Sequence, residues 1–244
     1  MKKILLISGA VLALGFAGTS SAAALCPPAA TAGTLPGFYL GVGGGWGGMH
    51  TPKLNDADRV FSGGPGSETV LGVAARASGG YLWAIPQVQN LQVGVELGYN
   101  YYKKNTYSLA GPNASDEWNY KGHSIDLLGV AKFNLGASGL NVLAKAGPAY
   151  VRQKMTITEN NLGALNTGWA GSESKVKPEA VVGVGYDITK NLDINATYTH
   201  IFGSEPGHVS DTGTVAAQKA NLNKVAPVDM YLLSIAYHFG SLGA

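Results

Sequence analysis

Five charged residues interrupt stretches of the chain that are otherwise apolar or rich in glycine: Arg76, Glu96, Asp126, Lys145 and Glu179. Each stands several residues from the nearest turn-like segment, so each should lie near the middle of its element. A charge at that depth must be paired, because burying an unpaired charge costs several kcal/mol. We therefore expect Arg76 to pair with Glu96. We expect Lys145 to pair with Asp126 or Glu179.

A hydrolytic site is the competing chemistry for the polar residues. His123 and Ser124 are adjacent in the sequence, and adjacent residues of a strand point to opposite faces, so they cannot form one site. His200 is followed by Ser204 without an evident carboxylate partner. The five histidines show no metal-ligand spacing, and Gly41–Gly48 lacks the Lys-Ser/Thr of a phosphate-binding loop. We therefore predict no enzyme, no metal and no cofactor.

The final stretch, Asp229–Phe239, shows what must position the charged residues. Its residues alternate strictly, with Tyr231, Leu233, Ile235, Tyr237 and Phe239 on one parity. Small, polar and apolar residues share the other parity. Alternation of this kind predicts a strand with two different environments. A continuously apolar face without charges favours lipid on one side and a packed lumen on the other.

Seven more stretches alternate in the same way. They are Phe38–Gly47, Thr69–Trp83, Leu91–Tyr102, Trp118–Phe133, Leu140–Val151, Pro178–Tyr186 and Leu192–Phe202. The connections between them are alternately long (48–66, 103–117, 152–177, 203–227) and short (84–90, 134–139, 187–191). This pattern predicts an all-β, eight-stranded antiparallel up-and-down transmembrane β-barrel with long extracellular loops and short periplasmic turns. A soluble lipocalin-like barrel would instead turn the parity carrying Gly, Glu, Arg and Lys toward water.

Aromatic residues gather at the ends of these stretches, as in the two interface girdles of a membrane barrel. One set lies next to the short turns or the C-terminus: Tyr81, Trp83, Phe133, Tyr186, Tyr237 and Phe239. The other set lies next to the long connections: Trp46, Tyr99, Tyr101, Trp118, Tyr150 and Phe202.

We predict that the barrel spans 37–240 and that both ends of the chain lie outside it. Residues 1–24 have Lys2 and Lys3, an apolar run and a small-residue site, and predict a signal peptide cleaved near Ala24. Residues 25–36 form a linker and 241–244 a C-terminal tail. The single cysteine, Cys26, cannot form an intrachain disulfide. Without Lys2 and Lys3 the 17 Lys+Arg become 15, against 15 Asp+Glu. This balance gives no reason to expect nucleic acid as a partner.

Four segments of the chain resemble a known family. They are Gly37–Gly47, Ala144–Val151, Lys177–Tyr186 and the final stretch. In these segments the chain is similar to small bacterial outer-membrane barrel proteins such as the OmpA transmembrane domain and the opacity proteins. The resemblance implies residence in the cell outer membrane, contact with its lipid and lipopolysaccharide, and insertion by the barrel-assembly machinery. Tyr237 and Phe239 match the family's aromatic assembly signal, although Gly240–Ala244 follows where many members end.

The functional expectation is a surface-exposed structural barrel with a salt-bridged, largely closed lumen. Its loops would be available to host surface ligands. Closure within one chain makes a monomer the expected state. Three alternatives stay open: a small gated pore, an OmpW-like passage for small apolar solutes and, least favoured, a lipid A-modifying enzyme. The passage would run along the apolar residues of the inner parity: Leu128, Val130, Leu143, Val181, Met230 and Leu232.

Overall fold

The computed structural model describes residues 34–49, 67–68, 71–88, 90–110, 114–161, 168–204 and 225–240. The predicted signal peptide (1–24), most of the predicted linker (25–36) and the predicted tail (241–244) lie outside the described residues, so those boundaries stay predictions. Within the described part of the chain, no helix has the length and apolar content needed to cross a membrane.

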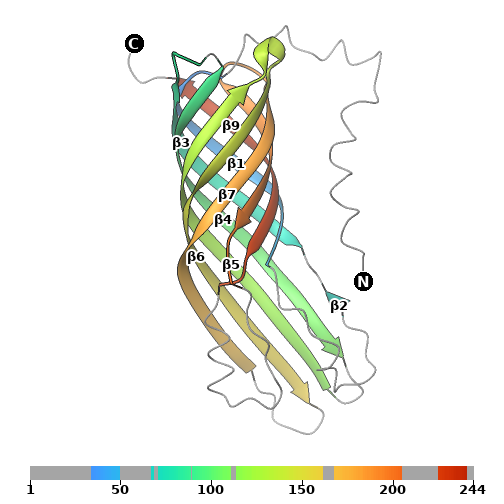
Figure 1. Cartoon of the computed structure of the whole chain (residues 1–244). Helices are drawn as coiled ribbons and strands as arrows, with labels where there is room; N and C mark the ends of the chain where they lie inside the picture. The colour runs from blue at the N-terminus through green and yellow to red at the C-terminus, as the bar shows by residue number, and fades with distance from the viewer. Residues whose placement is uncertain are drawn as a thin grey trace, which may run out of the picture.

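Eight long antiparallel strands form the body of the protein (Figure 1). They are β1 (Gly37–Met49), β3 (Gly72–Ala84), β4 (Leu91–Ala110), β5 (Ala114–Asn134), β6 (Leu140–Asn161), β7 (Gly168–Asp187), β8 (Leu192–Ile201) and β9 (Val228–Gly240). A two-residue strand, β2 (Ser67–Glu68), pairs with the outer part of β4. A 3₁₀ turn, Gly136–Ser138, joins β5 to β6.

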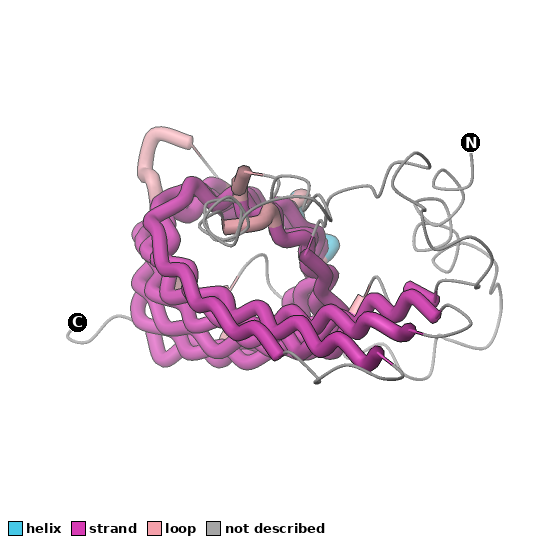
Figure 2. The backbone as a smooth tube through the Cα atoms, turned by 90° about the horizontal axis from the view of Figure 1, so that it is seen from below, coloured by secondary structure: helices cyan, strands magenta, loops and turns pink. Residues whose placement is uncertain are grey.

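The sheet closes into a barrel (Figure 2), and the first strand, β1, pairs with the last, β9. β1 pairs with β9 from Phe38↔Gly240 to Met49↔Val228, with one register irregularity near Phe38. Each long strand therefore has two hydrogen-bonded neighbours, and the barrel wall has no free edge. A closed wall is what a sheet in hydrocarbon requires, because no water there can satisfy an edge. The predicted eight-stranded antiparallel up-and-down barrel is confirmed.

Neighbouring residues of β9 show that the two parities have different environments. Leu233 is 56% exposed, whereas Leu232 is 4% exposed. The same alternation runs around the barrel, with large apolar side chains outward and polar, small or packed apolar side chains inward. The outward set includes Trp83, Phe133 and Phe239 near one end and Trp46 near the other.

Four strands are longer than the sequence indicates. The predicted loops at 103–117 and 152–177 are largely strand, because β4 runs to Ala110, β5 starts at Ala114, β6 ends at Asn161 and β7 starts at Gly168. These extensions project beyond the barrel body, at the end opposite the C-terminus (Figure 1). Outside the membrane both faces of a strand meet water, so the apolar alternation that marks the membrane segments is lost there. Trp118, which we expected in the girdle, lies in the extension of β5.

Candidate functional site: a buried charge network in the lumen

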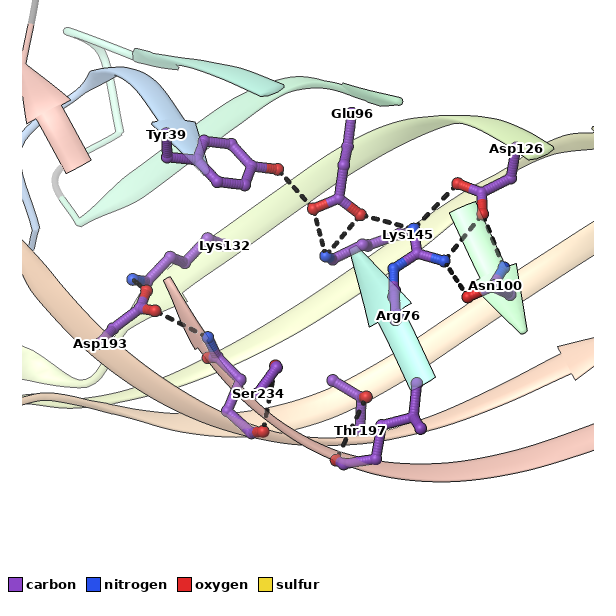
Figure 3. A network of polar contacts seen from close by, with 12 residues as sticks. Tyr39, Arg76, Glu96, Asn100, Asp126, Lys132, Lys145, Asp193, Thr197 and Ser234 are labelled. Carbon is purple, nitrogen blue, oxygen red and sulfur yellow. Dashed lines mark hydrogen bonds and ion pairs between the residues drawn. The ribbon is translucent and has the colours of Figure 1, made fainter. Parts of the chain in front are cut away.

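Arg76, at the middle of β3, is the centre of the lumen network (Figure 3). Its Nη1 donates to Asn100 Oδ1 and to Asp126 Oδ2, both at 2.7 Å. Its Nη2 donates to Glu96 Oε1 at 2.8 Å and to Asp126 Oδ1 at 2.9 Å. The pair with Asp126 is bidentate, which is the geometry that a planar guanidinium provides. Arg76 thus binds carboxylates from two strands at once.

Glu96, on β4, joins Arg76 to two further strands. Lys145 Nζ of β6 donates to both Glu96 oxygens, at 2.8 and 2.7 Å. The Tyr39 hydroxyl of β1 donates to Glu96 Oε2 at 2.7 Å. The expected partners of Lys145 were therefore wrong: it binds Glu96 rather than Asp126 or Glu179. Asp126 is held instead by Arg76 and by Asn100 Nδ2.

Glu179, on β7, lies at the margin of this network. Its Oε1 is 3.6 Å from Arg76 Nη1, within ion-pair distance. Among the described residues, no donor forms a hydrogen bond with either of its oxygens, and the side chain is buried. The five predicted charges do converge in the lumen, but Glu179 is held by charge alone.

The strand register explains why the network fits. Asn100 lies opposite Arg76, and Gly98 lies opposite Asp126. A Cβ built on Gly98 would overlap Arg76 Nη2 and Asp126 Oδ1. Glycine at this position therefore leaves the space that the guanidinium and the carboxylate occupy.

A second cluster, missed by the sequence analysis, surrounds Lys132 at the end of the lumen near the short turns. Lys132 Nζ donates to Asp187 Oδ1 at 2.8 Å and to Asp193 Oδ2 at 2.7 Å. His238 Nε2 lies 3.1 Å from the same Asp193 oxygen. These residues stand beside turns, where charges in a sequence look like ordinary solvent-facing residues.

The chain just before β1 takes part in this second cluster. The Thr34 hydroxyl accepts a hydrogen bond from Lys132 Nζ at 2.9 Å, and its carbonyl oxygen accepts one from Gln92 Nε2 at 2.7 Å. The backbone N–H of Leu35 donates to the Lys190 carbonyl. The end of the predicted linker is thus fixed across this mouth of the barrel.

Apolar side chains fill much of the remaining lumen. Leu128, Leu143 and Val181 form one buried cluster, and Met230 and Leu232 belong to another. A cavity of about 50 Å³ remains beside the charge network, lined in part by Ser78 and Ser234. That volume suits a few water molecules and is far below the ~300–1,000 Å³ of ordinary ligand pockets.

The residues considered for hydrolysis do not assemble into a nucleophilic site. Ser124 is buried in the lumen, whereas His123 is on the outward parity. The sequence pattern indicated no carboxylate partner for His200. In the structure, His200 Nδ1 on β8 lies 2.6 Å from Asp229 Oδ1 on β9. Ser204 Oγ, however, accepts a hydrogen bond from Lys177. No serine among the described residues forms a hydrogen bond with His200. The described part of the chain also has no group of three or more His, Cys, Asp or Glu that could hold a metal ion.

The two residues of the predicted assembly signal lie on the outer surface of β9. Tyr237 is 48% and Phe239 51% exposed, and their rings meet edge to face. Phe239 also packs against Phe38 of β1, with ring centroids 5.6 Å apart. This contact stands at the seam where the barrel closes. A role in assembly stays a prediction.

Comparison with known proteins agrees with this architecture. The model of the family described as "Outer membrane protein beta-barrel domain" matches residues 10–239. Outer membrane protein A of Serratia marcescens is 25% identical over 231 residues, which are 94% of this chain and 55% of that protein. The chain thus spans about half the length of that relative.

Two solved structures are similar at lower identity. Ail, the attachment invasion locus protein of Yersinia pestis, is 12% identical with a TM-score of 0.43, covering 83% of this chain and 99% of Ail. Neisserial surface protein A is 16% identical with the same TM-score, covering 83% of this chain and 97% of that protein.

Proposed function

On the premise that the chain belongs to the outer membrane protein β-barrel domain family, we propose that it is a structural barrel of the outer membrane whose lumen is closed by its own side chains. The observation that carries the proposal is the reach of the Arg76 network. Through Glu96, Asp126 and Lys145 it connects side chains of β3, β4, β5 and β6 across the lumen, and Tyr39 adds β1. An eight-stranded lumen is just wide enough for such side chains to fill.

The energetics of buried charges favour the closed state. Separating Arg76 from Asp126 and Glu96 would leave one cation and two carboxylates without partners at low dielectric. Breaking a buried pair in this way costs about 3–5 kcal/mol. Thermal motion alone therefore opens this lumen rarely.

Planar bilayer recording with the full mature chain tests the proposal. The wild-type protein should show no discrete conductance steps, and Glu96→Ala, which frees Arg76, Lys145 and Tyr39, should produce them. Glu173→Ala is the matched control, because Glu173 lies on the β7 extension and pairs with Lys175 at 3.4 Å. Steps of equal size in the wild type and in Glu96→Ala would overturn the closed lumen.

A gated pore is the second candidate, favoured by one feature of the network. Glu179 stands within ion-pair distance of Arg76 without a hydrogen bond. The guanidinium of Arg76 can therefore exchange its present carboxylate partners for Glu179. If this exchange opens the lumen, the wild type shows voltage-dependent steps, and Glu179→Gln abolishes them while leaving the closed state intact.

The projecting part of β4–β7 is the surface that we propose for contact with ligands outside the cell. It is an antiparallel sheet that stands beyond the barrel body (Figure 2). Exposed segments on a rigid scaffold are common recognition sites. Binding of whole cells to host surfaces should fall when 105–119 and 154–173 are replaced by short turns, and unchanged binding would remove this role.

Export and assembly complete the proposal. We infer removal of residues 1–24 before insertion and recognition of Tyr237 and Phe239 by the barrel-assembly machinery. N-terminal sequencing of the outer-membrane form should begin near Leu25. Replacing both aromatics by alanine should lower the yield of the heat-modifiable form, and Tyr231→Ala, farther from the C-terminus, is the control.

A further inference from the structure

The charged side chains that the structure describes at the centre of the lumen do not balance. Arg76 and Lys145 supply two positive charges, whereas Glu96, Asp126 and Glu179 supply three negative charges if all are ionised. An uncompensated charge in a buried, low-dielectric site is strongly unfavourable, and such a group neutralises itself instead. The central network therefore needs one further positive charge.

The hydrogen bonds show which carboxyl group is least able to stay ionised. Glu96 accepts four hydrogen bonds, and Asp126 accepts three. Donors of this kind stabilise a carboxylate. The side chain of Glu179 is fully buried, and neither of its oxygens accepts a hydrogen bond from a described residue. Glu179 is thus the carboxyl group whose charge is least stabilised.

Arg76 does not make up for the missing donors. Its Nη1 lies 3.6 Å from Glu179 Oε1. Each terminal nitrogen of a guanidinium carries two hydrogens, and Nη1 already donates to Asn100 and Asp126. The Nη1 group therefore has no hydrogen left for Glu179. Its Nη2 group is also fully used, by Glu96 and Asp126.

The strands beside Glu179 supply no charge at its level. Gly147 of β6 and Ile201 of β8 lie opposite it in the pairing register. Tyr102 of β4 is a further titratable group near Glu179, and its neutral hydroxyl adds no charge. The 50 Å³ cavity of the lumen is lined by Glu96 and Lys145 but not by Glu179. A counter-charge at Glu179 must therefore be smaller than a hydrated ion.

We propose that Glu179 is a proton-binding site that stays occupied at neutral pH, so that the closed lumen contains one carboxylic acid. The proton leaves two cations against two carboxylates in the central network. Burial and the nearby carboxylates Asp126 and Glu96 both favour the neutral form. The 3.6 Å contact with Arg76 is then the ion pair of the deprotonated form. The site rests on the proposed closed lumen, because bulk water beside Glu179 would stabilise its charge.

Infrared spectroscopy of the full mature chain detects this proton directly. The C=O stretch of a carboxylic acid is separate from the bands of a carboxylate and of the peptide backbone. Micelles of a detergent without ester groups avoid an overlapping carbonyl band. At neutral pH the wild type should show an acid band that Glu179→Gln lacks. Glu173→Gln on the β7 extension is the matched control and should keep the band. Identical acid regions in the wild type and Glu179→Gln would contradict the proposal.

The pH dependence of stability gives a second readout. The unfolded chain releases the Glu179 proton above about pH 4.3, whereas the folded lumen keeps it at neutral pH, so stability falls as pH rises in this range. Relative to Glu179→Gln, the unfolding equilibrium constant of the wild type should rise about tenfold per pH unit between about pH 5 and about pH 7. Urea titrations at each pH measure this slope. Parallel profiles of the two proteins would mean that folded Glu179 is ionised.

A change in the charge count tests the cause of the protonation. Asp126→Asn leaves two cations against Glu96 and Glu179, so Glu179 should ionise. The acid band should then vanish from the heat-modifiable form although Glu179 is still present. A band of unchanged intensity would rule out the charge excess as the reason for the proton.

Bilayer recording separates this site from the proposed closed lumen. A wild type without conductance steps and without the acid band would remove the proton site and leave the closed lumen. Conductance steps in the wild type at neutral pH would remove the closed lumen, and the proton site with it.

Discussion

The cations of the lumen and those of the outer wall are the same residue types in opposite situations. Arg76 contacts Glu96 and Asp126, and Lys132 contacts Asp187 and Asp193. On the outer wall Lys121 lies opposite Lys154, and no ion pair joins either lysine to a carboxylate whose side chain the structure describes. Inside the barrel the chain must supply every counter-charge, because little water is present there. On the outer wall, solvent and lipid headgroups can supply the counter-charge.

The largest effect that sharpens this contrast is expected from Arg76→Met. The substitution leaves Glu96, Asp126 and Glu179 buried around an apolar side chain, so it should lower the free energy of unfolding by about 3–5 kcal/mol. Urea unfolding in detergent micelles, followed by tryptophan fluorescence, measures the change. Arg152→Met on the outer wall is the control and should stay within about 0.5 kcal/mol. Equal losses in the two variants would remove the distinction between lumen and wall.

Lys132→Met should lower the free energy of unfolding by about 3 kcal/mol, which is the lower end of the range for a broken buried ion pair. The loss is smaller because Asp193 keeps His238 and Asp187 keeps its hydrogen bond from Asn141 Nδ2 at 2.9 Å. The same urea titration measures it. A loss larger than that of Arg76→Met would mean that the cluster near the short turns, not the central network, dominates the lumen.

Gly98→Ala should lower the free energy of unfolding by about 1–3 kcal/mol, the usual cost of overpacking. Its new methyl group overlaps Arg76 Nη2 and Asp126 Oδ1. Gly44→Ala is a matched control on the outer face of β1, where the nearest atom is the Ala74 carbonyl oxygen at 4.0 Å. Equal stability of the two alanine variants would show that the network does not fill the space beside Gly98.

The smallest effect is expected from Thr34→Val, which removes one acceptor of Lys132 while two carboxylates remain. The loss should be about 1 kcal/mol, the net contribution of one hydrogen bond. Thr34→Ser keeps the hydroxyl and should restore the stability. If serine behaves like valine, the hydroxyl of Thr34 contributes nothing to closing this mouth.

The sequence predicts the membrane part of the fold well and the rest less well, for a physical reason. Where lipid meets one face of a strand, the apolar parity is enforced, so Leu91 and Leu140 were predicted as the first residues of β4 and β6. Beyond the membrane both faces meet water and the parity disappears. The extensions of β4 to Ala110 and of β6 to Asn161 were therefore predicted as loops.

Prediction of the buried charge network from the sequence has a similar limit. Depth along a strand selected all five charged residues of the central network, but it missed Lys132, Asp187 and Asp193, which are buried beside the short turns. It does not indicate which carboxylate a lysine reaches, because that depends on register and on side-chain length across the lumen. Lys145 was therefore given the wrong partners. His200 was left without Asp229 for the same reason, since the pair forms between β8 and β9.

A nitroxide scan of β9 tests the central claim, that one parity of this barrel meets lipid and the other a packed interior. Single cysteines at positions 231–236, in a Cys26→Ala background, would carry the label in lipid bilayers. Collision with oxygen should alternate with a period of two and be greatest at Tyr231, Leu233 and Ile235, the outward positions. Maxima at positions 232, 234 and 236, or no alternation, would contradict the account.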